Sequence, residues 1–115
     1  MHELSIAQSV IEQVEQAAGK EKAVRVLTVT LAIGALSGIE RESLEFVFPM
    51  AAEGTIAAGA VLVVEEVPAT AKCRACHAES DAQTPLLTCG KCGSSDVDVS
   101  GGRDLFIKSV ELETA

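Results

Sequence analysis

Cys73-Arg74-Ala75-Cys76-His77 and Cys89-Gly90-Lys91-Cys92-Gly93 decide the fold of this chain, because they carry all four of its cysteines as two C-x-x-C pairs. Twelve residues separate Cys76 from Cys89. A C-x-x-C turn holds two thiolates one metal-ligand bite apart, and a second such turn completes a tetrahedron of sulfurs. The spacing therefore predicts a structural Zn(II) site formed by Cys73, Cys76, Cys89 and Cys92.

Three other interpretations of these cysteines compete with zinc. A thioredoxin-like dithiol would use one pair and leave the other unexplained. Cys73-x-x-Cys76-His77 also matches the c-type haem attachment pattern, and four cysteines can form two disulfides. Haem attachment and stable disulfides both belong outside the cytosol. The N-terminus has an acidic residue at position 3 and a helical pattern, which is not a signal peptide, so we expect a cytoplasmic protein.

Composition narrows the class of protein further. The chain has 115 residues, of which 48% are hydrophobic and only 3% aromatic, so its core must be aliphatic. No apolar run reaches the roughly 18 to 20 residues of a membrane span. The net charge of −8 disfavours contact with a phosphate backbone, because nucleic-acid affinity comes from Lys and Arg. We expect neither a membrane nor a nucleic acid among its partners.

The hydrophobic pattern predicts two helices. The first should span about residues 5–18, stop at Gly19, and bury a stripe of apolar residues at helical spacing. The second should begin at the capping-box pattern Ser37-x-x-Glu40 and run to about Glu53, with Pro49 kinking or splitting it. The residues expected to face inward are Leu4, Ala7, Ile11, Val14 and Ala18 in the first helix and Leu44, Val47, Phe48 and Ala51 in the second.

Three strands are predicted at 23–33, 60–67 and 105–113, the last with Phe106, Val110 and Leu112 on one face. Since apolar patterns flank the cysteine module on both sides, the module should be an insertion in one core. The expected fold is α+β, with two helices packed on a small sheet of about three strands and an inserted four-cysteine, zinc-ribbon-like domain. The predicted boundaries are 1–68 plus 103–115 for the α/β domain and 69–102 for the zinc domain. About 30 residues cannot fold alone, so the metal must stabilise that insertion.

The first residues, Met1-His2-Glu3, hold one of the two histidines of the chain. The Met1 amine, the His2 backbone nitrogen and the His2 imidazole can chelate one ion in fused rings, and Glu3 adds a carboxylate or a further backbone nitrogen. Such a nitrogen-rich, nearly planar set favours Ni(II) or Cu(II) over Zn(II). The alternative is that His2 and Glu3 are simply solvated end residues.

Several segments together resemble the HypA/HybF family of hydrogenase-maturation nickel metallochaperones. These are Met1-His2-Glu3-Leu4-Ser5-Ile6, the run from Ile33 to Glu40 (IGALSGIE), Glu53-Gly54-Thr55 with Gly59-Ala60, and the two C-x-x-C pairs with Pro85-Leu86-Leu87 between them. The likeness covers essentially the whole chain, and the motifs occur in the family's order. His77 and Gly90 depart from common family residues, and Pro49 is unusual at its position.

The resemblance implies a non-enzymatic nickel carrier with two domains. It implies Ni(II) bound by Met1, His2 and Glu3 in the domain built from both chain ends, and Zn(II) in the inserted domain. It implies delivery of nickel to the [NiFe]-hydrogenase large subunit with a HypB-type GTPase as partner, and in some organisms a link to urease accessory proteins. We expect a monomer or a weak homodimer. The alternative functions are a zinc-ribbon protein-interaction module without a nickel role and a thiol redox enzyme.

Overall fold

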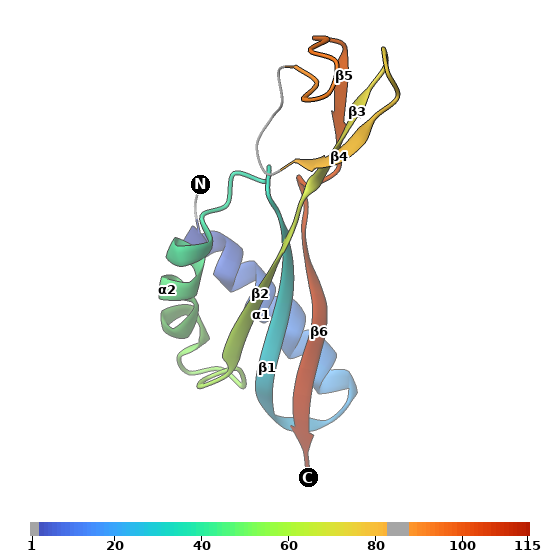
Figure 1. The fold of residues 1–115 in the computed structure, drawn as a ribbon. Helices are drawn as coiled ribbons and strands as arrows, with labels where there is room; N and C mark the ends of the chain where they lie inside the picture. Colours follow the sequence, from blue (N-terminus) through green and yellow to red (C-terminus); the bar gives the residue numbers. More distant parts are fainter. Residues whose placement is uncertain (1–2, 83–87) are drawn as a thin grey trace. The chain divides into compact units, whose positions relative to one another are not determined.

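A computed structural model describes residues 3–82 and 88–115 of the chain. In that part of the sequence, two helices and six strands follow in the order α1-β1-α2-β2-β3-β4-β5-β6. The strands form two three-stranded sheets, ordered β2-β1-β6 and β4-β3-β5 (Figure 1). This is the predicted α+β class, in which two helices accompany a three-stranded sheet and a second, smaller element carries the cysteines. No helix among the described residues has the length and apolar character needed to cross a bilayer.

The chain divides into two compact units. The first comprises Met1–Ala32, Ile39–Glu65 and Phe106–Ala115, and the second comprises Ile33–Gly38 and Glu66–Leu105. The assignment of nickel to one domain and zinc to the other, with the boundaries given above, stays a prediction.

In the first unit, α1 (Glu3–Lys20) buries one apolar stripe consisting of Ala7, Val10, Ile11, Val14 and Ala18. Leu4, predicted to face inward, is 47% exposed because it lies in the first turn, where the stripe is only beginning. The helix also continues through Gly19, which was predicted to stop it. Because Gly19 adopts no left-handed backbone, it does not act as a C-terminal cap.

Helix α2 (Arg41–Ala52) begins later than predicted. Its N-terminal flanking residue is Glu40, in an extended conformation without a capping side-chain hydrogen bond, so the capping-box prediction at Ser37 was wrong. The helix runs continuously through Pro49 rather than splitting there. Its buried side is Leu44, Phe48 and Ala52, whereas Val47 and Ala51 are only half-buried.

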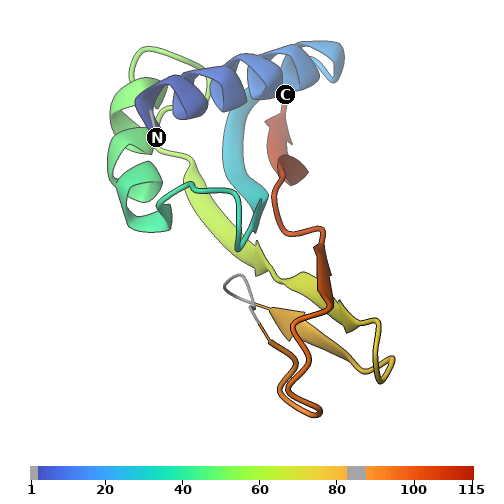
Figure 2. The same cartoon turned by 90° about the horizontal axis from the view of Figure 1, so that it is seen from above.

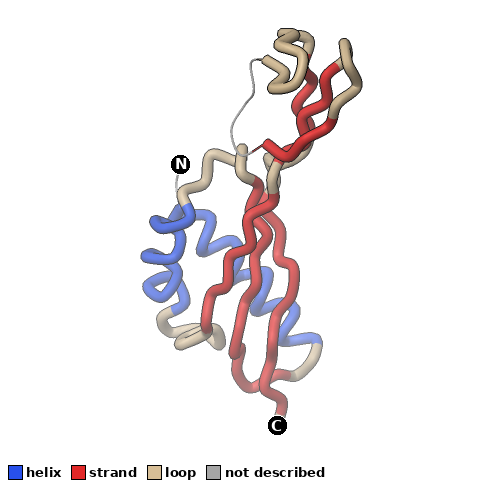
Figure 3. Tube along the Cα trace, in the orientation of Figure 1, coloured by secondary structure: helices blue, strands red, loops and turns tan. Residues whose placement is uncertain are grey.

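The sheet of the first unit is built from β1 (Ala23–Gly34), β2 (Val61–Val67) and β6 (Leu105–Thr114). Figure 2 shows α1 lying across one side of this sheet with α2 beside it, and Figure 3 shows the same arrangement by element type. The core between helices and sheet is aliphatic except for one phenylalanine. Its largest fully buried side chains are Phe48, Leu31, Leu44, Val14, Val26 and Val29.

Strand β6 departs from the predicted alternation. Leu105 and Ile107 are half-buried, and so are Val110 and Leu112, with exposed Lys108 and Ser109 between the two pairs. Two exposed residues in succession shift the alternation of the strand, so Phe106, predicted to share a face with Val110 and Leu112, is instead 54% exposed.

The second unit holds the sheet β4-β3-β5, with β3 (Ala69–Cys73) antiparallel to both β4 (Glu79–Ala82) and β5 (Val97–Ser100). Its small core consists of buried Ala69 and Ala71, packed against Leu36, Val97 and Val99. A core of two alanines and three partly buried aliphatic side chains is too small to stabilise a sheet by itself.

The segment Ile33–Gly38 joins the second unit through backbone contacts. Gly34 donates its N–H to the Asp104 carbonyl at 2.8 Å, and Leu36 donates to the Gly102 carbonyl at 2.6 Å. A Cβ on Gly34 would lie 2.2 Å from the carbonyl carbon of Gly102. Glycine at position 34 therefore lets two backbones approach more closely than any side chain permits.

Candidate metal centre

The first cysteine turn follows directly from β3, whose last residue is the buried Cys73. The His77 N–H donates to the Cys73 carbonyl at 2.9 Å, and the Cys73 N–H donates to the Ala78 carbonyl at 2.9 Å. The Cys76 N–H points at the Cys73 sulfur, 3.4 Å away. These hydrogen bonds close a tight turn over residues 73–78, and Cys73 and Cys76 lie on the same side of that turn.

The second cysteine turn repeats this pattern. The Gly93 N–H donates to the Cys89 carbonyl at 2.9 Å, and the Cys89 N–H donates to the Ser94 carbonyl at 2.7 Å. The Lys91 N–H lies 3.4 Å from the Cys89 sulfur. Both turns therefore aim backbone N–H groups at the first sulfur of each pair, which is favourable for a thiolate.

The four cysteine sulfurs converge. They lie within 4.8 Å of one another, with 3.5 Å between the sulfurs of Cys73 and Cys92 and 3.7 Å between those of Cys76 and Cys89. A disulfide would bring two sulfurs to about 2.05 Å, and none of the four cysteines is in a disulfide. A tetrahedral ion with metal–sulfur bonds of about 2.3 Å separates its sulfurs by about 3.8 Å. The geometry fits a tetrahedral metal site with four cysteine ligands.

Hydrogen bonds and neighbouring sulfurs shift the pKa values of these cysteines in different directions. The N–H groups of Cys92 and Lys91 lower the pKa of Cys89 to about 6. The Cys76 N–H, more than any other group, lowers the pKa of Cys73. The Ser94 N–H acts to lower the pKa of Cys92, but its neighbouring sulfurs, Cys73 foremost, and desolvation outweigh it and raise that pKa to about 12. Four sulfurs this close cannot all ionise without a cation to offset their repulsion.

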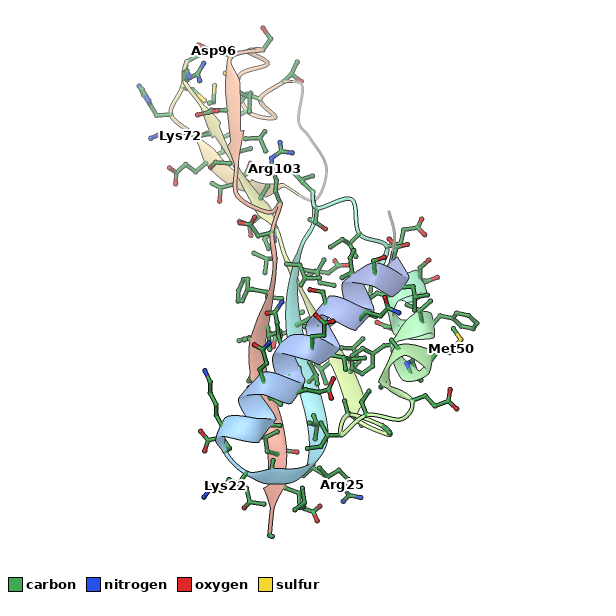
Figure 4. All side chains as sticks on the ribbon, turned by 180° about the vertical axis from the view of Figure 1, so that it is seen from behind. Lys22, Arg25, Met50, Lys72, Asp96 and Arg103 are labelled. Atoms are coloured by element: carbon green, nitrogen blue, oxygen red, sulfur yellow. The ribbon has the colours of Figure 1, made fainter. Side chains whose placement is uncertain are left out.

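An ionic contact between the two turns was not foreseen from the sequence. Arg74, in the first turn, donates its backbone N–H to the Asp96 carbonyl at 2.9 Å and its guanidinium to the Asp96 carboxylate at 3.0 Å. The same guanidinium lies 3.7 Å from the Asp98 carboxylate on β5. The side chains are well exposed, so the ion pairs add little stability, but they tie the two turns together. Asp96 is labelled in Figure 4.

Of the three predicted nickel ligands, Met1 and His2 lie outside the described residues. Glu3 is the first residue of α1, and its side-chain oxygen Oε2 is buried with no hydrogen-bond partner in the described part of the chain. His77, the other histidine, is exposed at the end of the first cysteine turn and has a left-handed backbone conformation.

Fold and site together define an α+β protein that carries a four-cysteine metal site in a zinc-ribbon-like domain. The family model described as "Hydrogenase/urease nickel incorporation, metallochaperone, hypA" matches residues 1–112. The chain belongs to this HypA family of nickel metallochaperones.

Similar proteins agree in sequence and in fold. A hydrogenase maturation factor HypA from Nitrosospira multiformis is 46% identical over 114 residues, covering 99% of both chains. One from Streptomyces avermitilis is 48% identical over 117 residues, covering 98% of this chain and 88% of the relative. The solution structure of the Ni metallochaperone HypA from Helicobacter pylori covers 100% of both chains with a TM-score of 0.69 at 24% identity, which supports the fold.

Proposed function

We propose that this protein binds one Ni(II) ion at its N-terminus and delivers it to the [NiFe]-hydrogenase large subunit during maturation, while its four cysteines hold a structural Zn(II) ion. The nickel ligands in this proposal are the Met1 amine, the backbone nitrogen and imidazole of His2, and Glu3. Membership of a nickel-incorporation family supports the nickel cargo. Relatives named hydrogenase maturation factors support the client.

One observation supports the position proposed for the nickel site. The Glu3 oxygen Oε2 is the buried side-chain polar atom that lacks a hydrogen-bond partner among residues 3–82 and 88–115. Burying an acceptor without a partner costs about 1–3 kcal/mol, so such an atom in a native fold calls for a ligand. Because Glu3 follows His2 directly in the chain, a cation chelated by Met1 and His2 is a suitable ligand for this oxygen.

The ligand types suit a carrier. A primary amine, a backbone nitrogen and an imidazole favour Ni(II) or Cu(II), whereas four thiolates in a tetrahedron favour Zn(II). One chain can therefore offer each metal its own preferred donor set. A chelate at the end of the chain also lets the ion leave for the next protein without unfolding a core.

Zinc in the four-cysteine site would supply the stability that the second unit lacks. Its core consists of Ala69 and Ala71 with three partly buried side chains. Structural zinc sites contribute folding free energy directly, and small metal-binding domains often unfold without their ion. We therefore assign the cysteine ion a structural role and the N-terminal ion the role of cargo.

The decisive experiment is metal content of the untagged protein after dialysis with one equivalent of Ni(II). Wild type should retain one zinc and one nickel, and His2→Ala should retain zinc alone. His77→Ala is the matched control, because the chain has only these two histidines. That variant should keep both metals. Nickel retained by His2→Ala, or lost from His77→Ala, would place the nickel elsewhere.

Delivery needs its own test. We propose a cytoplasmic carrier that works with a HypB-type GTPase and, in organisms with urease, with urease accessory proteins. Nickel-loaded wild type should transfer its ion to the metal-free large subunit, and His2→Ala should not. If neither protein retains nickel while both retain zinc, the alternative function stands, a zinc-ribbon protein-interaction module without a nickel role.

A further inference from the structure

The solvent-facing side of α2 carries two large apolar side chains. Phe46 is 75% exposed and Met50 is 53% exposed. They are four residues apart in one helix, so they lie next to each other on the same side. Figure 4 shows Met50 projecting outward from the helix. We call Glu42, Phe46 and Met50, together with Glu53 directly after the end of the helix, the outer face of α2.

The fold of the first unit does not need these two side chains. The buried residues of α2 are Leu44, Phe48 and Ala52, on the opposite side of the helix. The chain has three phenylalanines and no tryptophan or tyrosine, and it leaves three-quarters of the Phe46 surface exposed to solvent. Phenylalanine and methionine are both enriched where proteins contact other proteins. Methionine also adapts its shape to a partner surface.

Two carboxylates border this apolar pair. Glu42 precedes Phe46 by one helical turn, and Glu53 follows Met50 by three residues. Both residues are exposed, and neither carboxylate has a hydrogen-bond or ion-pair partner within the described residues. Glu45 differs, because it already accepts a hydrogen bond from Arg41 at 2.7 Å. The outer face is thus apolar at its centre and carries uncompensated negative charge at both ends.

We infer that the outer face of α2 docks into an apolar groove, rimmed by Lys or Arg, on a partner protein. Phe46 and Met50 would fill the groove as an amphipathic helix does, with anchors one turn apart. Glu42 and Glu53 would meet the basic rim, which speeds association and excludes acidic partners. This inference rests on the proposed function, since a carrier must contact the proteins that receive or handle its ion.

Charge disfavours a second copy of this chain as the occupant. Two outer faces brought together would oppose the carboxylates of Glu42 and Glu53 on both copies, and each chain carries a net charge of −8. Like charges placed opposite one another across an interface are repulsive and suppress that pairing. A basic groove offsets the same charges instead.

The test measures binding of the zinc-loaded protein, with and without added Ni(II), to two purified probes, the hydrogenase large subunit and the HypB-type GTPase. Phe46→Ser should raise the dissociation constant for at least one probe by roughly tenfold or more. Val61→Ser is the matched control, since Val61 is 59% exposed but lies on β2, and it should bind like wild type. Glu42→Gln with Glu53→Gln should flatten the salt dependence of the association rate.

The outcomes separate this inference from the proposed function. Equal affinity of wild type and Phe46→Ser for both probes, or no binding of either probe by wild type, overturns the docking surface. A wild-type dimer that Phe46→Ser converts to a monomer also overturns it, because the occupant would then be a second copy. Phe46→Ser should still retain one nickel. Loss of nickel from wild type would defeat the proposed function while leaving the docking measurement intact.

Discussion

His77 and Gly93 occupy equivalent positions in the two cysteine turns. Each follows the second cysteine of its pair, and each donates its backbone N–H to the carbonyl of the first cysteine at 2.9 Å. Their φ angles are 63° and 75°, both in the left-handed region. Glycine adopts that region without penalty, whereas other L-residues pay about 1–2 kcal/mol. The first turn therefore carries a strain that the second avoids.

His77→Gly should stabilise the zinc-loaded protein by up to about 1 kcal/mol, because it removes this strain, although glycine also gains freedom in the unfolded chain. Gly93→Ala should destabilise it by about 1 kcal/mol through the converse effect, since its new Cβ would meet nothing within 4 Å. Thermal unfolding of both variants with one zinc bound measures this. Destabilisation by His77→Gly would contradict a strain at His77 that exceeds the entropy cost of the added glycine.

Gly34→Ala should strongly destabilise the second unit. Its Cβ would lie 2.2 Å from backbone carbon and oxygen of Gly102, and backbone cannot move aside as a flexible side chain can. We expect a loss of about 2–4 kcal/mol, together with weaker zinc retention in competition with a chelator. Gly19→Ala is the control, because Gly19 lies in α1 with nothing within 4 Å of the added Cβ. That change should stabilise the helix by about 0.5–1 kcal/mol. Equal effects of the two would contradict the close approach at Gly34.

Pro49→Ala should stabilise the first unit. Proline inside α2 removes the N–H that would bond to the Glu45 carbonyl and crowds that carbonyl, at a cost of about 3 kcal/mol. The greater freedom of the unfolded chain offsets part of the gain, which leaves about 1–2 kcal/mol. Far-ultraviolet circular dichroism during thermal unfolding measures it, with exposed Met50→Ala as the control expected to change stability by less than about 0.5 kcal/mol. A lower midpoint in Pro49→Ala would mean that the proline ring makes contacts that the helix needs.

Zinc affinity should rise with pH across the neutral range. Zinc binds thiolates, so every cysteine that is still protonated must release a proton on binding. Cys89, with its pKa lowered to about 6, is already a thiolate at neutral pH and releases none. Cys92, with its pKa raised to about 12, remains a thiol up to high pH and must release one. The apparent dissociation constant should therefore fall by at least about tenfold per pH unit between about pH 7 and 9. Competition with a chromophoric chelator, corrected for the chelator's own protonation, measures this, and a flat profile would contradict it.

The sequence predicted the elements that depend on strong local signals. Two C-x-x-C pairs predict converging sulfurs because the turn itself sets the distance within each pair. The apolar residues Ala7, Ile11, Val14 and Ala18 predict one buried helix face, because this segment carries no competing hydrophobic pattern. The predictions that failed depend on tertiary context. The Ser37-x-x-Glu40 pattern did not start a helix because Ile33–Gly38 is held in a turn by hydrogen bonds to residues distant in the sequence, such as Gly102.

Contacts between segments that lie far apart in the sequence could not be predicted from local sequence patterns. Phe106 was predicted to share a face with Val110 and Leu112, but the two successive exposed residues Lys108 and Ser109 shift the alternation of the strand, so Phe106 faces solvent. Lys108 reaches Glu65 on β2 at 2.7 Å, a pairing that the sequence of β6 cannot reveal. The contact of Arg74 with Asp96 joins two turns 22 residues apart. The orphaned oxygen of Glu3 is likewise visible only once α1 is packed.

The backbone bonds of Ile33–Gly38 bear on how the metal-binding part of this chain could be transplanted. Leu36 packs against Ala69 and Ala71, so the second unit contains a side chain supplied from more than thirty residues upstream. A fragment cut as residues 66–105 would lose that side chain and leave the Gly102 carbonyl without its donor at Leu36. The part of the second unit that carries the cysteines is therefore not a segment that can be transferred by itself. To graft it onto another protein, the host would have to supply a second, short piece of chain in the place of Ile33–Gly38.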